Sequence, residues 1–178
     1  SCSELKSIYI LLRPKKGKPI EQRLKEILEL QLFEPIKNYN PELFKKLIPI
    51  AGDVSDKNLG LSTDDLNRMK NVSIVYHSAA SVRFDDTLKE AVMMNTRGTR
   101  ELMEFATTLR NVKCVMHVST TYNNLGVGSV KEEIYPPIAD WKKTIEVCEK
   151  MDSDIVNHLT KRYINLMPNT YVFSKNLA

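Results

Sequence analysis

The sequence predicts an α/β fold built on a parallel β-sheet. Two observations support this prediction. Short apolar runs rich in β-branched residues alternate with longer stretches whose apolar residues recur at helical spacing. Strands that alternate with helices pair in parallel, because each helix carries the chain back across one face of the sheet with a right-handed crossover. At this length we expect residues 1–178 to form a single domain with a substantial core.

The first half of the chain contributes two predicted strands. SIYILL at residues 7–12 predicts a buried strand, and the basic loop RPKKGKP follows it at 13–19. Residues 19–37 predict one helix, because apolar residues recur there at helical spacing: Ile20, Leu24, Ile27, Leu28 and Leu30. KLIPIAGDVSD at 46–56 predicts a second strand that runs into an Asp-containing turn.

The second half repeats the alternation. NVSIVYHSAASV at 71–82 predicts a third strand, and its continuous apolar centre predicts burial on both faces. Residues 85–110 predict a long helix capped by Asp85 and Asp86. The remaining predicted elements are, in order, a strand at 112–122, a loop at 123–140, two helices at about 141–151 and 153–162, and the start of a helix at 169–178.

The composition narrows the class of protein. It is 42% hydrophobic and 27% charged, as in soluble globular proteins, and a net charge of +4 is too small and too scattered to predict a nucleic-acid partner. There is no apolar run of membrane-spanning length and no signal peptide. Cys2, Cys114 and Cys148 form no C-x-x-C motif, and no histidine lies at metal-ligand spacing from them. We therefore expect a reduced, intracellular chain without a bound metal.

Polar or small residues follow each predicted strand. In open parallel sheets, ligands bind beyond the carboxyl ends of the strands, so these positions are the candidates for a site. They are Arg13, Asp53, residues 77–82 and residues 119–122.

Five motifs occur in an order and spacing typical of one superfamily. They are GDV at 52–54, HSAASV at 77–82, NTRGT at 95–99, HVST at 117–120 and YVFSK at 171–175. In this respect the sequence resembles an extended short-chain dehydrogenase/reductase. The resemblance implies a Rossmann-like, doubly wound parallel sheet that binds a nicotinamide cofactor.

A finer likeness extends over essentially the whole chain. The stretches LLRPKKGK, IPIAGDVSDKNLGLS, VRFDDTLKEAVMMNTRGT, HVSTTY, YPP and PNTYVFSK resemble the reductase domain of alcohol-forming fatty acyl-CoA reductases, in particular the animal enzymes. LRPKKGK and YPPIAD carry most of the specificity, because more distant relatives lack them.

One feature of that family is missing from the sequence. The family opens with a strand and a turn of the form T-G-x-x-G-F-L-G, which binds the cofactor pyrophosphate. No such turn occurs here, and the chain begins with Ser1. We expect a fragment that starts within the following helix, so that the first strand is missing, and that stops within the helix carrying YVFSK. Activity of residues 1–178 alone is not expected.

Tyr171 and Lys175, four residues apart, project from one face of a helix, and the resemblance implies that they are the catalytic pair. The resemblance implies that Tyr171 donates a proton to the substrate carbonyl oxygen and that Lys175 binds the nicotinamide ribose. A phenol with an ordinary pKa of ~10 needs a nearby cation for this work, and Lys175 would supply it. The resemblance also assigns Thr120 to orient the substrate oxygen and Ser119 to bind cofactor. The alternatives are a surface pair and hydroxyls that cap a strand end.

Arg13 predicts the choice of cofactor. Folds that prefer NAD place an acidic residue at this strand end, whereas here the cations are Arg13, Lys15, Lys16 and Lys18, with no carboxylate among them. A guanidinium there would bind the 2′-phosphate of NADPH. The alternative is a solvated basic loop.

The other predicted cofactor contacts are Asp53, Val54, Ala79, Ala80 and Asn95. Asp53 would accept a hydrogen bond from the adenine amine beside the Val54 backbone, which is compatible with an Asx-turn. Ala79 and Ala80 would let the backbone approach the cofactor, or else serve helix–strand packing. Asn95 is a poor helix former in mid-helix, which predicts a buried side chain that bonds backbone near the site. His77 is expected to be a core histidine bonded to backbone, and His117 and His158 to be structural or exposed.

The resemblance implies NADPH-dependent reduction of long-chain fatty acyl-CoA to a primary alcohol through an aldehyde. It also implies association with the endoplasmic reticulum or peroxisome membrane, on the cytosolic face, through parts outside this chain. Two alternatives stay open: an extended reductase or epimerase acting on another carbonyl, and a catalytically silent, truncated binding partner. A nucleic-acid binder is disfavoured, because the clustered cations lack interleaved aromatic residues. The oligomeric state is not predicted.

Overall fold

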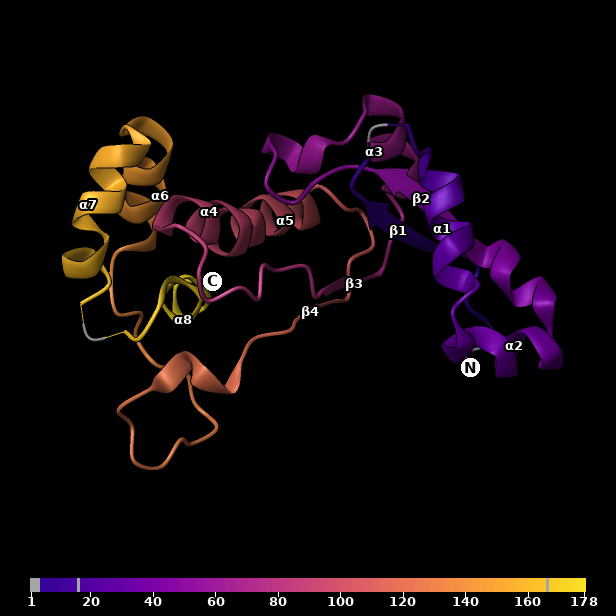
Figure 1. The fold of residues 1–178 in the computed structure, drawn as a ribbon. Coiled ribbons are helices and arrows are strands. Elements are labelled where there is room, and N and C mark those ends of the chain that lie inside the picture. The colour runs from indigo at the N-terminus through magenta and orange to yellow at the C-terminus, as the bar shows by residue number, and fades with distance from the viewer. Residues whose placement is uncertain (1–3, 16, 166) are drawn as a thin grey trace. The chain divides into compact units, whose positions relative to one another are not determined.

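The computed structural model describes residues 4–15, 17–165 and 167–178 and divides the chain into two compact units, Ser1–Lys70 and Asn71–Ala178 (Figure 1). Cys2 and Lys16 lie outside the described residues. Each unit contains one pair of parallel strands. The predicted α/β class is therefore confirmed, with the described strands forming two separate parallel pairs.

In the first unit, β1 (Ile8–Leu12) pairs in parallel with β2 (Leu47–Ala51) along its whole length. Helix α1 (Ile20–Leu28) packs against β2, and its Leu24 is buried. The other elements of this unit are η1 (Gln31–Phe33), α2 (Glu34–Tyr39), η2 (Pro41–Lys46), η3 (Lys57–Gly60) and α3 (Thr63–Met69).

The single helix predicted over residues 19–37 is wrong. The backbone turns extended at Leu30, with ψ 143°, and α2 then begins with Pro35 in its first turn. Proline has no N–H to donate, and its ring clashes with the carbonyl four residues earlier, so it is tolerated in the first turn of a helix and not in its interior. The helical spacing of the apolar residues is real, but Pro35 divides it between two helices.

In the second unit, β3 (Ile74–His77) pairs in parallel with β4 (Cys114–His117). Between them, α4 (Leu88–Ala91), the π-helical segment η4 (Val92–Arg97) and α5 (Gly98–Thr107) form one continuous helical rod (Figure 1). After β4 come η5 (Thr121–Asn124), α6 (Trp141–Lys150), α7 (Ser153–Tyr163) and α8 (Thr170–Asn176). The helices predicted at the end of the chain are confirmed to within one or two residues.

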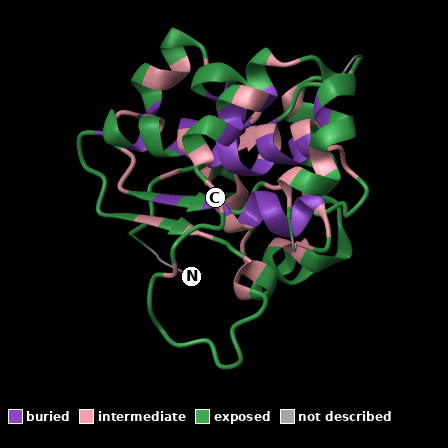
Figure 2. Ribbon diagram, turned by 90° about the vertical axis from the view of Figure 1, so that its left-hand side faces the viewer, coloured by how far each residue is buried: buried purple, intermediate pink, exposed green. Residues whose placement is uncertain are grey.

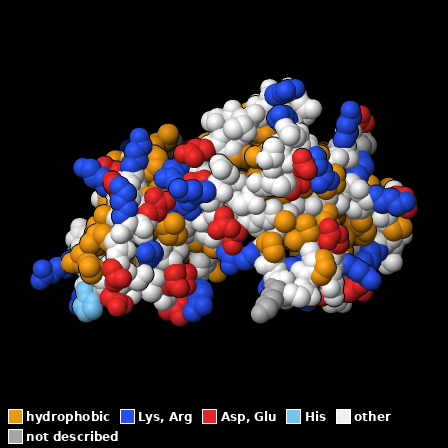
Figure 3. Space-filling model, turned by 90° about the horizontal axis from the view of Figure 1, so that it is seen from above, with side chains coloured by type: hydrophobic (Ala, Val, Ile, Leu, Met, Phe, Trp, Pro, Cys, Tyr) orange, Lys and Arg blue, Asp and Glu red, His pale blue; other side chains and the backbone are white. Residues whose placement is uncertain are grey.

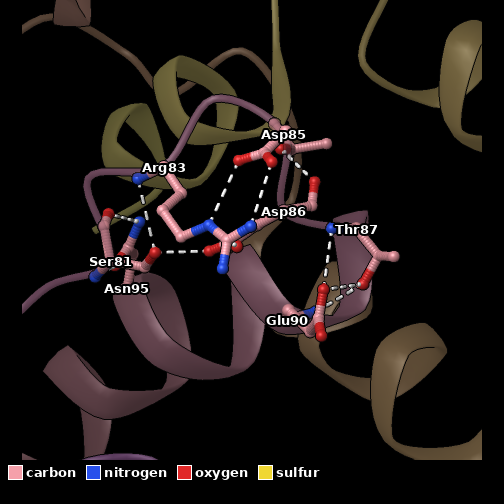
Figure 4. Close-up of polar contacts among 8 residues, drawn as sticks. Ser81, Arg83, Asp85, Asp86, Thr87, Glu90 and Asn95 are labelled. Carbon is pink, nitrogen blue, oxygen red and sulfur yellow. Dashed lines mark hydrogen bonds and ion pairs between the residues drawn. The ribbon is translucent and has the colours of Figure 1, made fainter.

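The predicted cap of the long helix is wrong. The helix begins at Leu88, and Thr87 caps it: the Thr87 hydroxyl accepts from the Glu90 backbone N–H, and the Glu90 carboxylate accepts from the Thr87 backbone N–H (Figure 4). This capping box satisfies two N–H groups at once. Asp85 and Asp86 instead pair with the Arg83 guanidinium in the preceding loop.

The third strand is buried on one face only, contrary to the sequence prediction. Val75 and His77 are buried, whereas Ile74 and Tyr76 are 48% and 69% exposed. Helix α5 packs against β3 on the buried side. The continuous apolar run predicted a strand correctly, but it did not show whether one face or both faces of that strand are buried.

The core of the second unit lies between the long helical rod and the C-terminal helices (Figure 2). Helix α8 is buried along most of its length, because its residues pack on side chains from α4, η4, α6 and α7. The cluster consists of Leu88, Val92, Ile145, Cys148, Val156, Phe173 and Leu177. Burial raises the pKa of the Cys148 thiol to about 11, so this cysteine packs in the core as a neutral thiol and does not act as a nucleophile.

Charges of both signs are interspersed on the face of the molecule drawn in Figure 3, consistent with the small net charge of +4. Among the described residues, no helix is long and apolar enough to cross a membrane.

The capping box generates a stability prediction. We expect Thr87→Ala to lower the free energy of unfolding by about 1 kcal/mol, because the Glu90 backbone N–H loses its acceptor. Asp85→Ala removes only an exposed ion pair and should leave the free energy of unfolding nearly unchanged. Thermal unfolding of the complete protein that contains this chain measures both. An equal loss of stability in the two variants would contradict the assignment of Thr87 as the helix cap.

Candidate active site

The carboxyl ends of β3 and β4 define the site in the second unit. Because the two strands are parallel and in register, the residues that follow them emerge at the same edge. The pairing extends beyond the strands, since the Val118 backbone N–H donates to the His77 carbonyl at 2.9 Å. Helix α8 packs against η4 and η5, which brings YVFSK to this edge.

Lys175 is the charged group of the site. Its side chain is buried, with the residue only 3% exposed, and its Nζ donates to the Val118 carbonyl at 2.9 Å and lies 3.5 Å from Nε2 of His117. Burial lowers the pKa of this ammonium. Among the described residues, no carboxylate forms an ion pair with it. The ammonium therefore keeps donor capacity for a ligand at the end of β4.

Tyr171 lies one turn before Lys175 on the same helix. Its ring contacts the ring of Phe84, with centroids 5.3 Å apart, and the residue is 9% exposed. No hydrogen bond links the Tyr171 hydroxyl to another part of the chain that the structure describes. A phenol that is oriented by packing and has no protein acceptor is available to donate to a bound carbonyl.

Asn95 joins three segments around this helix. Its Oδ1 accepts from the Ser81 N–H at 2.8 Å, and its Nδ2 donates to the Ser81 carbonyl at 3.1 Å and to Oγ of Ser174 at 2.9 Å. Thr96 adds a bond from its hydroxyl to the Ser174 carbonyl at 2.8 Å. Ser174 lies between Tyr171 and Lys175, so these bonds fix the rotation of α8 about its own axis. Asn95 and Thr96 both lie in the π-helical segment, and such segments are frequent at functional sites.

The loop between β3 and the rod is held by charged groups (Figure 4). Arg83 bonds Asp85 at 3.0 Å and pairs with Asp86, which also accepts from the Ser81 hydroxyl. The Asp86 carbonyl accepts from the Thr170 hydroxyl at 2.7 Å, so this loop is tied directly to the start of α8.

Thr120 and Ser119 follow β4 at the same edge. Thr120 is half-buried, and its Oγ1 accepts from the Tyr122 N–H at 3.4 Å, which leaves its hydroxyl proton free to donate. Ser119 is exposed and accepts from the Asn123 amide. Asn123 is also tied to α8, because its carbonyl accepts from Asn176 at 2.7 Å.

The first unit holds the remaining predicted residues at the carboxyl ends of its own strands. Arg13 donates from Nη2 to Oδ1 of Asp53 at 3.0 Å, and its Nε pairs with the other carboxylate oxygen. The Ser55 N–H and hydroxyl also donate to Asp53, which is an Asx-turn. Partial burial opposes ionisation, but these bonds prevail and hold the pKa of Asp53 below its usual value. Val54 is buried beside it.

The residues that follow β1 include no carboxylate, as predicted, but Asp53, which follows the neighbouring strand β2, lies beside Arg13. Lys18 likewise pairs with Glu26. Nε and Nη2 of the Arg13 guanidinium face Asp53, and within the described residues Nη1 has no hydrogen-bond partner. The side chain is 54% exposed.

The structure brings the predicted residues together in two sets. Ala79, Ala80, Asn95, Ser119, Thr120, Tyr171 and Lys175 lie in the second unit, at or beneath the ends of β3 and β4. Arg13, Asp53 and Val54 lie at the ends of β1 and β2. The assignment of each residue to substrate or cofactor stays a prediction.

Sequence reasoning missed three residues of the site: Phe84, His117 and Ser174. His117 was expected to be structural or exposed, and it contacts Lys175. His77 was expected to bond backbone, but its Nε2 bonds the Thr99 hydroxyl at 2.9 Å. Ser174 lies within the YVFSK motif, between Tyr171 and Lys175, which was a signal for it. No comparable signal distinguished Phe84 or His117.

The residues present fit the ribose end of a nicotinamide cofactor. The Lys175 ammonium has three N–H groups and two protein neighbours, which leaves one donor for a hydroxyl. Ala79 and Ala80 add little bulk at the end of β3. Gly52, by contrast, is needed for packing within the protein, because a Cβ there would lie 2.5 Å from Leu11 and from the Leu59 carbonyl. No cluster of three or more metal-ligating side chains occurs in the described parts of the chain.

Comparison with known proteins gives concordant results. A family model of an NAD-binding domain, described as male sterility protein, matches residues 1–178. Fatty acyl-CoA reductase 1 of Homo sapiens is 37% identical over 100% of this chain, and fatty acyl-CoA reductase 2 of Homo sapiens is 37% identical over 98%. The chain covers 35% and 34% of these two proteins, so it spans about a third of the length of the curated relatives it matches.

Two solved structures share the fold. The terminal R domain from the myxalamid PKS-NRPS biosynthetic pathway has a TM-score of 0.63 at 23% identity, over 95% of this chain and 36% of that chain. A thiolation-reductase di-domain from an archaeal non-ribosomal peptide synthetase has a TM-score of 0.58 at 24% identity, over 98% of this chain and 40% of that chain. Both structures are of reductase domains, and the likeness establishes the α/β fold of this chain.

His77 generates a prediction about pH. The Thr99 hydroxyl donates to the Asn95 carbonyl, so it accepts from Nε2 of His77, and the buried Nδ1 has no partner among the described residues. Burial, followed by the charges of His117 and Lys175, lowers the pKa of His77 to about 4. The depressed pKa contributes stability that is present above the unfolded value of 6.5 and is lost as pH falls through 4.

We expect this loss to be roughly 3 kcal/mol between those limits, and to be absent in His77→Gln, whose amide can still bond Thr99 but takes up no proton. Chemical unfolding of the complete protein and the variant at pH 7 and near pH 4 measures the difference. The same pH dependence in both proteins would show that His77 does not titrate in this way.

Proposed function

Because the chain belongs to the NAD-binding family described as male sterility protein, we propose that it is part of an NADPH-dependent enzyme that reduces long-chain fatty acyl-CoA to a primary alcohol. The observation that supports this most is the placement of α8. It presents the Tyr171 phenol, which has no hydrogen bond to the described residues, and the buried Lys175 ammonium at the shared edge of two parallel strands. Reductases of carbonyl groups need a proton donor and a fixed cation at that place.

When bound, the reduced nicotinamide supplies the hydride. Lys175 would hold the cofactor ribose with its third N–H, while the Val118 carbonyl keeps the ammonium in place. The same ammonium would stabilise negative charge on the Tyr171 oxygen as that group gives up its proton. One buried cation thus serves both binding and proton transfer.

Thr120 and Tyr171 would bind the carbonyl oxygen of the acyl thioester. As negative charge develops on that oxygen, the two hydroxyl groups stabilise it by hydrogen bonds. Collapse of the resulting oxyanion breaks the carbon–sulfur bond and releases coenzyme A and an aldehyde. In a second round, Tyr171 protonates the aldehyde oxygen as it is reduced, which yields the primary alcohol.

The surroundings of Tyr171 support an apolar substrate. Phe84 contacts the Tyr171 ring and is 59% exposed, and Val82 on the same loop is 70% exposed. Apolar side chains beside the proposed proton donor would contact the acyl chain of the thioester and remove its apolar surface from water. Both human relatives are named as fatty acyl-CoA reductases, which supports the same class of substrate.

Arg13 supports NADPH over NADH. Asp53 is already bonded by Arg13 and Ser55, so most of its acceptor capacity is used within the protein. The Arg13 guanidinium, in contrast, retains donors on Nη1, and Asp53 holds it in one orientation. An oriented guanidinium is suited to a 2′-phosphate. By family resemblance we place the complete protein on the cytosolic face of the endoplasmic reticulum or peroxisome membrane.

The central test follows NADPH oxidation by the complete protein with palmitoyl-CoA and identifies the lipid product. We expect fatty alcohol, and a loss of roughly 10²-fold or more in kcat for Tyr171→Phe, because the phenolic proton is gone. Tyr163→Phe is the matched control, since it removes a hydroxyl bonded to Thr144 in α6. Unchanged turnover in Tyr171→Phe would remove this residue from the mechanism. Binding of NADPH without oxidation would indicate another carbonyl substrate or a silent partner.

The cofactor assignment has its own test. We expect Arg13→Leu to raise the Kd for NADPH about tenfold or more and to change the Kd for NADH by less than about twofold. Fluorescence titration of the complete protein measures both constants. Arg68→Leu, which removes a guanidinium paired with Asp65 on α3, is the control and should change neither. Equal weakening of both cofactors would exclude recognition of the 2′-phosphate by Arg13.

A further inference from the structure

The imidazole of His117 faces the buried ammonium of Lys175, with Nε2 and Nζ 3.5 Å apart. His117 is the last residue of β4, and Lys175 reaches it from α8, 58 positions later in the chain. We propose that His117 is a positioning residue for Lys175: its neutral imidazole accepts a hydrogen bond from the ammonium and, with the Val118 carbonyl, fixes the direction of the third N–H. The part of this inference that concerns the cofactor rests on the proposed function.

Burial of Lys175 creates the need for such an acceptor. An ammonium has three donors and no acceptor, and a buried charge without hydrogen-bond partners is costly. The Val118 carbonyl accepts one bond at 2.9 Å. Within the described residues, no carboxylate pairs with Lys175, so Nε2 of His117 is the second acceptor that the site provides.

The protonation state of His117 agrees with this role. Burial, followed by the positive charge of Lys175, lowers the pKa of His117, so the ring is neutral near pH 7. If Nε2 presents its lone pair to Lys175, the ring proton lies on Nδ1, which is buried and has no partner in the described residues. A protonated ring would instead place two cations 3.5 Å apart.

A second imidazole lies behind the first. The ring of His77 on β3 is 5.0 Å from that of His117, and burial and the neighbouring charges lower its pKa to about 4. Two neutral imidazole rings therefore lie in succession beside the Lys175 ammonium, and neither adds a further positive charge.

Among the described residues, the charged side chains of the other helical elements packed against α8 have partners elsewhere. Lys89 on α4 donates to the Met151 carbonyl, and Glu90 caps its own helix. Arg97 on η4 pairs with Glu149, and Tyr122 on η5 is half exposed. The depressed pKa of Lys175 is thus attributed to its burial.

The test compares three variants of the complete protein. His117→Leu removes the acceptor, and His117→Gln keeps an acceptor in a side chain that does not titrate. His158→Leu is the control, because His158 is exposed on α7 and its only described bond is to the Asp154 carbonyl of the same helix.

The first readout is thermal unfolding at pH 7 and near pH 10, which needs neither cofactor nor substrate. We expect His117→Leu to lower the melting temperature by about 4 °C at pH 7, because a buried ammonium has lost a partner. The loss should shrink near pH 10: the folded pKa of Lys175 is depressed, so the penalty for holding its charge disappears as pH rises through that pKa. Gln should restore most of the loss at pH 7, and His158→Leu should change nothing.

A loss that is the same at both pH values, or that Gln does not restore, would assign His117 to packing and overturn the proposal. The second readout is NADPH oxidation with palmitoyl-CoA. We expect kcat/KM to fall about tenfold in His117→Leu and to recover to within about threefold in His117→Gln. If the wild type does not oxidise NADPH with acyl-CoA, the proposed function fails, while the unfolding comparison still decides the role of His117.

Discussion

The constraint on which the site depends is the burial of the Lys175 ammonium. Removing such a charge from water costs several kcal/mol unless hydrogen bonds replace the water. The protein provides the Val118 carbonyl and the His117 imidazole, both at the end of β4, and no carboxylate in the described residues. The charge is thus held in place without being neutralised, which is what a carbonyl reductase requires of a group that stabilises developing negative charge.

The second requirement is that α8 keeps a fixed rotation, since Tyr171 and Lys175 must face the same edge. Asn95 meets this requirement by bonding Ser174 on α8 and the Ser81 backbone at once. Asn95 lies in a π-helical segment of the rod. The preceding helix α4 contributes to the hydrophobic core, while the π-helical segment directs the polar side chain of Asn95 toward α8. Fold stability and site geometry therefore share the same contacts.

The sequence predicted those parts of the structure that depend on local order. The alternation of strands and helices and the last three helices follow from periodicity, whereas the Tyr171–Lys175 pair was singled out by its family resemblance. It failed where a local rule competed with another: Pro35 divides an otherwise regular helical pattern, and Thr87 with Glu90 outcompetes two nearby aspartates as a cap. The long-range contacts around the proposed catalytic pair could not be predicted, because Asn95 bonds Ser174 across 79 positions and His117 meets Lys175 across 58.

A crystal structure of the complete protein with bound NADP⁺ would test the role of Lys175 most directly. The account predicts that Nζ of Lys175 lies about 3 Å from a hydroxyl of the nicotinamide ribose while it still donates to the Val118 carbonyl. It also predicts that the Tyr171 hydroxyl faces the nicotinamide ring. A cofactor ribose bound away from Lys175, or a Lys175 ammonium paired with a carboxylate, would contradict the account.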